Sequence, residues 1–194
     1  MSLTLYYHPL SSFCWKALIG IYEKDVAFEG QIVNFMDPEE DAAFRKIWPV
    51  RRFPVLRDEA EDRLIPESSI ILEYIDQKFS GGPRLIPTDP TRAREMRLRD
   101  RVLDLYVHVP MQKVVTDRLR PEGKHDPFGV DQAKDLIETS YRMLDQEMRS
   151  RAWIMGDDFT MADCAAMPAL FYGAMAVPLG EHRNLADYLD RLKQ

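Results

Sequence analysis

Short apolar runs of strand period and amphipathic stretches of helical period alternate along the first part of the chain. In LTLYY (3–7), Leu3, Leu5 and Tyr7 fall on one face, which predicts a half-buried strand. The following SSFCWKALIGIYEK (11–24) repeats apolar positions every three or four residues, which predicts a helix. By the same criteria we expect strands at 28–35, 53–57 and 63–65, and helices at 38–48 and 67–79. The predicted order is β-α-β-α-β-β-α.

After a segment rich in glycine and proline, only helical patterns follow. FSGGPRLIPTDPTRAR (79–94) contains two glycines and three prolines, which is typical of a linker between two bodies. Beyond it we expect a long helix pair with a kink at Pro110, and then three more helices. Their ranges are 89–121, 129–148, 160–175 and 184–194. Thr160 and Asp163 have the spacing of a capping box, which gives that motif a structural role. The predicted fold class is an α/β domain at 1–80, a linker at 81–90 and an all-α domain at 91–194.

Composition narrows the class of protein. Hydrophobic residues make up 45% and charged residues 30%, the mix of a soluble globular protein, and the formal net charge of −6 disfavours nucleic-acid binding. No apolar run reaches the ~18 residues of a membrane helix, and the start lacks the pattern of a secretory signal. Cys14 and Cys164 lie far apart, without a C-x-x-C motif or metal-ligand spacing. We therefore expect a cytoplasmic protein with no metal, no membrane and no nucleic-acid partner.

Two serines and a cysteine occupy the turn between the first strand and the first helix. Ser11 or Ser12 could cap the helix, or one hydroxyl could donate to a thiolate held at the positive helix end. The second possibility favours Ser11, because it precedes the helix body. Cys14 sits one step further in, among apolar residues, and is predicted to be core. Tyr7 ends the strand, so its phenol is an alternative donor or simply a packed ring.

The stretch RRFPVL (51–56) places a proline at the beginning of a predicted strand. Pro54 removes a ladder donor, which suits an edge position or a cis bond, and a ligand backbone could then pair with Phe53. Arg51 and Arg52 could bind a carboxylate, although a solvated basic pair is the commoner meaning.

The stretch PESSIILEYI (66–75) puts an acid directly before two serines at a predicted helix start. The hydroxyl of Ser68 and the first-turn N–H groups could receive a carboxylate, while Glu67 could receive an ammonium group. Together these charges match an α-amino-acid headgroup. The alternative is a plain cap, which needs only Ser68 or Ser69.

In this order and spacing, five motifs resemble a cytosolic glutathione transferase over essentially the whole chain. They are HPLSSFCWK, FPVL, ESSIILEYI, LIPTDPTRAR and GDDFTMADCAAMPALF. The resemblance implies a thioredoxin-like N-terminal domain, a helical C-terminal domain, glutathione as co-substrate and usually a homodimer. Two features depart from the family pattern. Arg51-Arg52 stands where Gly-Lys is common. The chain also ends at Gln194, earlier than most relatives, so we expect a final helix to be missing.

The resemblance also implies roles for single residues. Ser11 matches the activating serine of theta-like and zeta-like classes, whereas Tyr7 matches the activator of tyrosine-dependent classes. Cys14 lies three residues past the position used by cysteine-dependent classes, which argues against a thiol-based mechanism. Pro54 matches the family's cis-proline. The glutathione-binding residues implied are Ser12, Arg52, Phe53, Pro54, Glu67 and Ser68.

The expected reaction is attack of the glutathione thiolate on a small hydrophobic electrophile, the chemistry of detoxification. The expected electrophile pocket is lined by Leu10, Phe13, Tyr106, Val109, Pro110 and Met111, unless their helix faces turn inward. A zeta-like isomerase of a cis-unsaturated diacid, as in maleylacetoacetate isomerase, is the enzymatic alternative. It needs cations in the pocket, for which this region offers only His108 and Lys113. A non-catalytic partner-binding protein of the same fold is the third possibility.

Overall fold

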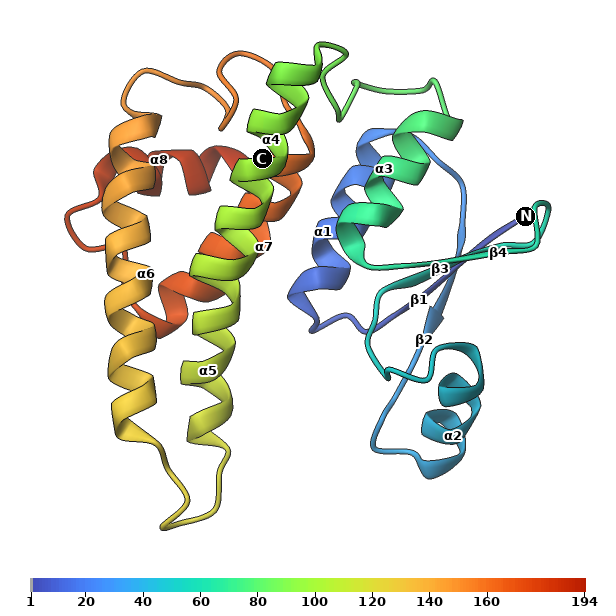
Figure 1. The fold of residues 1–194 in the computed structure, drawn as a ribbon, viewed down its shortest axis with the longest axis horizontal. Helices are drawn as coiled ribbons and strands as arrows, with labels where there is room; N and C mark the ends of the chain where they lie inside the picture. Colours follow the sequence, from blue (N-terminus) through green and yellow to red (C-terminus); the bar gives the residue numbers. More distant parts are fainter. Residues whose placement is uncertain (1) are drawn as a thin grey trace. The chain divides into compact units, whose positions relative to one another are not determined.

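The computed structural model describes residues 2–194, which form two compact units, one through Ile86 and one spanning Pro87–Gln194. The elements of the first unit are β1 (Leu3–Tyr7), α1 (Ser12–Glu23), β2 (Glu29–Ile32), α2 (Pro38–Ile47), β3 (Val55–Asp58), β4 (Arg63–Pro66) and α3 (Ser68–Lys78) (Figure 1). The β-α-β-α-β-β-α order expected from the sequence is confirmed. The boundary between the units falls inside the expected linker, 81–90.

The four strands form one mixed sheet in the order β2-β1-β3-β4. β1 runs parallel to β2 and antiparallel to β3, and β4 runs antiparallel to β3. The helix α1 makes the crossover that a parallel β1–β2 pair requires. As the alternation in the sequence predicts, Leu3 and Leu5 are buried on one face, and Tyr6 packs against Phe44 of α2 on the other.

Helices cover both faces of this sheet. α1 and α3 lie side by side and bury one apolar cluster with the strands (Figure 1). Its buried members are Leu3, Leu5, Ala17, Ile21, Val26, Leu56, Ile65, Ile71 and Ile75. α2 covers the other face through Phe44, which contacts Val33 and Val55. The first unit is thus a thioredoxin-like layer of helices, sheet and helix.

Strands β2 and β3 differ most from the sequence prediction. β2 covers only Glu29–Ile32 of the expected 28–35; it is an edge strand with one neighbour, and all four of its residues are exposed. β3 begins at Val55 instead of Phe53, directly after the Phe53–Pro54 peptide bond, which is cis. A proline cannot donate to a ladder, so the strand starts after it.

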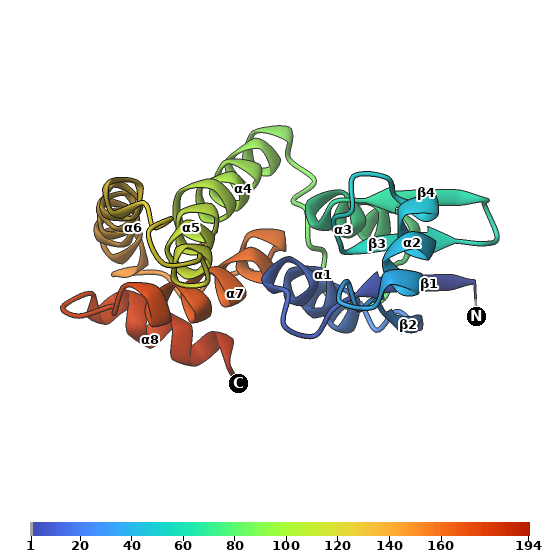
Figure 2. The same ribbon diagram turned by 90° about the horizontal axis from the view of Figure 1, so that it is seen from below.

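The second unit contains helices only. They are α4 (Pro90–Val102), the π-helix η1 (Leu103–His108), α5 (Val109–Arg118), α6 (Pro127–Met148), α7 (Met161–Ala176) and α8 (Arg183–Leu192). α5 and α6 lie side by side (Figure 2). Within residues 2–194, no helix is both long enough and apolar enough to cross a membrane.

The chain stays helical from Pro90 through Arg118, but it adopts π geometry just before Pro110. Pro110 has no N–H to donate to the carbonyl of Tyr106, four residues earlier. The hydroxyl of Ser140 on α6 donates to that carbonyl at 3.2 Å. The same hydroxyl has a closer acceptor in the carbonyl of Leu136, at 2.7 Å, so its bond to Tyr106 is a shared one. The widened π turn is the main feature that accommodates the proline.

The predicted capping box at the start of α7 is present. The buried carboxylate of Asp163 accepts from the N–H of Thr160 at 2.8 Å. It also accepts from the N–H of Ile154 at 2.8 Å and from the phenol of Tyr188, in α8, at 2.5 Å. This one side chain therefore joins a loop and two helices, which is a larger structural role than a local cap.

Candidate functional site

Three segments that are distant in sequence meet at one end of the sheet. Tyr6, near the end of β1, lies opposite Val55, at the start of β3. Val55 in turn lies opposite Pro66, at the end of β4. The β1–α1 turn, the Phe53–Pro54 segment and the start of α3 consequently lie next to one another. The strand register thus brings together the serine turn, the proline segment and the Glu67–Ser68 pair.

Ser11 is the N-cap of α1, and its hydroxyl oxygen accepts a hydrogen bond from the N–H of Cys14 at 3.4 Å. The side chain is partly exposed, whereas that of Ser12 is buried. A serine hydroxyl has one donor and two acceptor positions, so capping occupies an acceptor, while the O–H group lies close enough to the Cys14 sulfur to hydrogen-bond it. The thiolate-stabilising role predicted for Ser11 requires this O–H group to turn from Cys14 to the ligand.

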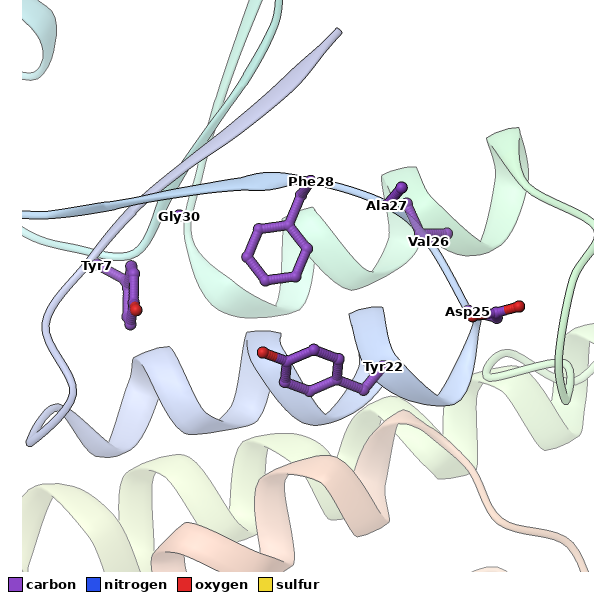
Figure 3. Close-up of a pocket in the computed structure, with 7 residues that line it drawn as sticks. All are labelled: Tyr7, Tyr22, Asp25, Val26, Ala27, Phe28 and Gly30. Atoms are coloured by element: carbon purple, nitrogen blue, oxygen red, sulfur yellow. The ribbon is translucent and has the colours of Figure 1, made fainter. Parts of the chain in front are cut away.

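Tyr7 is the last residue of β1, and its ring packs toward β2. A Cβ atom added to Gly30 of β2 would lie 3.0 Å from the Tyr7 ring, so the ring packs directly over this glycine. Figure 3 shows Tyr7 in a pocket that it shares with residues of α1 and β2. Ser11 lies in the β1–α1 turn. Tyr7 follows Tyr6, which lies opposite Val55, so both candidate activators lie at the end of the sheet that carries Pro54, and the choice between them stays a prediction.

Cys14 is fully buried, as the sequence predicts. Burial raises the pKa of its thiol to about 11, and hydrogen bonds from Ser11 and His8 offset only part of this effect. A thiol with this pKa is almost entirely protonated near neutral pH. Cys14 is therefore a core residue, and Cys164 is fully buried as well.

Aromatic rings surround the proline segment. Phe53 stacks on Phe35 with ring centroids 4.7 Å apart and on His8 with centroids 5.9 Å apart. The His8 contact links the β1–α1 turn to the proline segment. No local pattern around His8 predicts this contact, because it arises where the β1–α1 turn meets the segment before β3.

The two arginines before Phe53 have different environments. Arg51 forms an ion pair with Asp41 and lies over the Phe35 ring at 4.4 Å from its centroid. Its φ of 58° is in the left-handed region. Arg52 is exposed, and within residues 2–194 its side chain forms no ion pair. Arg51 is thus occupied by structural contacts, which leaves Arg52 as the arginine that can meet a ligand carboxylate.

The start of α3 has an unusual backbone conformation. Glu67 is the N-cap, with φ 72° and ψ 123°, and its side chain makes no capping hydrogen bond. The plain serine cap considered from the sequence is therefore not the arrangement found. A left-handed φ in a residue other than glycine costs about 1–3 kcal/mol and is concentrated at functional sites. Glu67 is exposed and Ser68 is buried at this end of the sheet.

Lys16 is a residue of this region that sequence reasoning missed. It lies in the second turn of α1, its side chain is 1% exposed, and its Nζ donates to the hydroxyl of Ser69 at 2.8 Å. This bond joins the start of α1 to the start of α3. The signal in the sequence was a charged residue inside an otherwise apolar helix.

Two family models match the chain. Residues 5–83 match the N-terminal domain of glutathione S-transferases, and residues 127–191 match their C-terminal domain. The chain belongs to the glutathione S-transferase family.

Individual relatives of this glutathione S-transferase family member carry several names. A stringent starvation protein A homologue of Coxiella burnetii is 29% identical over 87% of this chain and 75% of that protein. A maleylacetoacetate isomerase of Emericella nidulans is 28% identical over 100% of this chain and 88% of that protein. The crystal structure of a glutathione S-transferase from Methylobacillus flagellatus, with glutathione bound, is 25% identical over 99% of this chain and 98% of that one, with a TM-score of 0.88.

The residues expected to line an electrophile pocket come from both units. In the first unit, Leu10 is exposed and Phe13 is partly buried. In the second unit, Tyr106 and Val109 are exposed, whereas Pro110 and Met111 are buried. Tyr106 and Val109 thus have side-chain surface available to a substrate, and the pocket itself stays a prediction.

The acid and base side chains of this family member form no metal centre in the described part of the chain. Across residues 2–194, no three His, Cys, Asp or Glu side chains are placed to hold a metal ion together.

Proposed function

We propose that this protein is a glutathione transferase that binds glutathione at the end of the sheet where the serine turn, the proline segment and the start of α3 meet. The observation that carries the proposal is the strand register, which aligns Tyr6, Val55 and Pro66 across three strands. It brings together two helix starts, those of α1 and α3. A helix start favours anions, and glutathione offers a thiolate and two carboxylates.

In the proposed complex, each end of the tripeptide meets groups of opposite charge. Glu67 receives the ammonium group of the γ-glutamyl end, and Ser68 with the start of α3 receives its carboxylate. Phe53 pairs its backbone with the cysteinyl part, next to Pro54. Arg52 meets the carboxylate of the glycine end. This arrangement places the glutathione sulfur toward the β1–α1 turn.

Ser11 is the proposed activator. Its O–H donates to the sulfur and thereby favours the thiolate, and the positive end of α1 acts in the same direction. The thiolate then attacks a small apolar electrophile, forming a carbon–sulfur bond as the leaving group departs with its electron pair. Ser12, which is buried, supports the turn from the inside.

Retention on immobilised glutathione and conjugation of chlorodinitrobenzene test the proposal. Glu67→Gln removes the charge that meets the ammonium group, which we expect to weaken glutathione binding by about tenfold or more, because hydrogen bonds to charged groups contribute about 1.5–3 kcal/mol. Glu39→Gln is the matched control, since Glu39 is an exposed acid in the first turn of α2, away from the site. A parent protein that passes through the resin would refute the proposal and favour a non-catalytic partner-binding role.

Isomerisation of a cis-unsaturated diacid is the second candidate. The full-length match to a maleylacetoacetate isomerase favours it. The two cations considered for its substrate weigh against it, because His108 is 1% exposed and Lys113 is paired with Asp126. Turnover of maleylacetoacetate faster than that of chlorodinitrobenzene, per mole of enzyme, would make isomerisation the main activity.

Two further expectations stay proposals: that the protein is a homodimer and that it works in the cytoplasm in detoxification. Its two cysteines are free and buried, which suits a reducing compartment. Light scattering on the purified protein would give the number of chains per particle directly.

A further inference from the structure

The pocket of Figure 3 lies in the first unit, on the side of β1 that faces the edge strand β2. It has a volume of about 550 Å³ and is lined by residues of β1, α1, β2 and the α1–β2 loop. Figure 3 shows three aromatic rings along the pocket: Tyr7 at one end, and Phe28 and Tyr22 packed against each other further along. The Tyr22 and Phe28 rings are tilted by 56°, with centroids 5.8 Å apart.

The three rings differ in how closely they pack against the core. Phe28 and Tyr7 pack against the buried cluster beneath α1 and α3, so their positions are fixed by the core. Tyr22 is 66% exposed and forms an open wall. Gly30 is needed at the base of the pocket, because a Cβ atom there would lie 3.0 Å from the Tyr7 ring and force it to shift.

The electrostatic surroundings of the pocket are negative. Asp25 lines its far end, beyond Val26 (Figure 3), and the exposed acids Glu23 and Glu29 adjoin lining residues in the chain. The cation of this segment, Lys24, is buried and paired with Asp76 at 3.0 Å. Three carboxylates therefore face solvent in a segment whose positive charge is already neutralised. Exposed charges act over about 10 Å at ordinary salt, which covers the pocket.

We propose that this pocket binds a small organic cation of the alkylammonium class. Aromatic faces attract cations that are only weakly hydrated, and a quaternary or highly substituted ammonium group presents methyl groups to the rings while keeping its charge. The neighbouring carboxylates add attraction without a direct ion pair. A neutral apolar guest gains from the rings but not from the charge, and an anion is repelled.

Choline and its neutral carbon isostere, in which carbon replaces the quaternary nitrogen, test the charge dependence directly. Each compound is titrated into the full chain, and the amide NMR signals of Phe28 and Gly30 report binding at the pocket. We expect choline to bind about fivefold more tightly than the isostere, as a cation–π contribution predicts. Equal or tighter binding of the isostere, or no shift at Phe28 and Gly30, would overturn the proposal.

Tyr22→Leu and Tyr22→Phe form a matched pair, because only the first removes the aromatic face. We expect Tyr22→Leu to weaken choline binding about fivefold and Tyr22→Phe to leave it nearly unchanged. Asp25→Asn, at an exposed position, lowers the affinity for choline but not for the isostere. If all three variants bind choline like the parent, the assignment is wrong. Because Tyr22 and Asp25 lie outside the proposed glutathione site, retention on immobilised glutathione stays unchanged in every case.

Discussion

Replacing Ser11 by glycine separates the two roles of its hydroxyl. The structural role is a long cap, with 3.4 Å between the hydroxyl oxygen and the N of Cys14. Glycine is itself tolerated as an N-cap, so the change costs only a few tenths of a kcal/mol in the free energy of unfolding. Ser11→Gly should therefore fold like the parent, whereas alanine would add a loss of about 1 kcal/mol. Glycine is the better probe of function for this reason.

The chemical role of Ser11 carries the larger free energy. A hydrogen bond to a charged acceptor contributes about 1.5–3 kcal/mol, and the thiolate of bound glutathione is such an acceptor. Removing the donor raises the pKa of the bound thiol, so below that pKa the thiolate fraction falls about ten- to hundredfold. The value of kcat/KM for chlorodinitrobenzene should fall by the same factor, and the loss should shrink as pH rises. KM for glutathione should change little, because most contacts to the tripeptide remain.

Tyr7→Phe is the matched control, since it removes one hydroxyl and keeps the ring over Gly30. We expect its pH profile to follow that of the parent. The assay is kcat/KM across pH, together with ultraviolet absorbance of the bound thiolate in the absence of electrophile. The reasoning fails if Ser11→Gly keeps the acid limb of the parent profile while Tyr7→Phe shifts it. That result would assign activation to the phenol.

Two other predictions concern protonation. Burial raises the pKa of the Cys14 thiol to about 11, so Cys14 should resist thiol labelling in the native protein at neutral pH and react fully once the protein is denatured. Fast labelling of Cys14 in the native state would contradict this. The pKa of Asp58 is lowered despite its burial, chiefly by hydrogen bonds from Lys78 and Tyr74. Asp58 therefore adds stability above its unfolded pKa of about 4, and this stability is lost as the pH falls below that value. Asp58→Asn should lower the free energy of unfolding by about 2 kcal/mol at pH 7 and flatten the dependence of the denaturant midpoint on pH in the acid range. If the midpoints of the two proteins fall in parallel with pH, the ion pair of Asp58 with Lys78 does not stabilise the fold.

Local patterns in the sequence were sufficient to predict most of the elements and the fold class. The alternation around Leu3 and Leu5 defined the faces of β1, and the spacing of Thr160 and Asp163 defined the start of α7. These predictions succeed because each pattern reports on neighbours within a turn or a strand. The residues proposed to bind glutathione, in contrast, were inferred from order and resemblance, and the register of β1, β3 and β4 brings their segments together.

Features that depend on nonlocal packing could not be predicted from the sequence. Nothing near Tyr7 in the chain says that its ring lies over Gly30, because that contact arises from the parallel pairing of β1 with β2. Likewise, Lys16 meets Ser69 only because α1 and α3 pack side by side. The contact of the Ser140 hydroxyl with the carbonyl of Tyr106 also joins two helices that are distant in the sequence.

The start of α3 connects these structural details with the proposed chemistry. In the first unit, α1 and α2 begin with side-chain caps from Ser11 and Asp37. α3 begins with Glu67 in a left-handed conformation and without a side-chain cap. Without a side-chain cap the free energy of unfolding is lower by about 1 kcal/mol, and the backbone conformation of Glu67 lowers it by about 1–3 kcal/mol more. A ligand carboxylate at this helix start would supply the absent acceptor. The free protein lacks this interaction, so bound glutathione should stabilise the first unit, and the backbone at the start of α3 should gain the most.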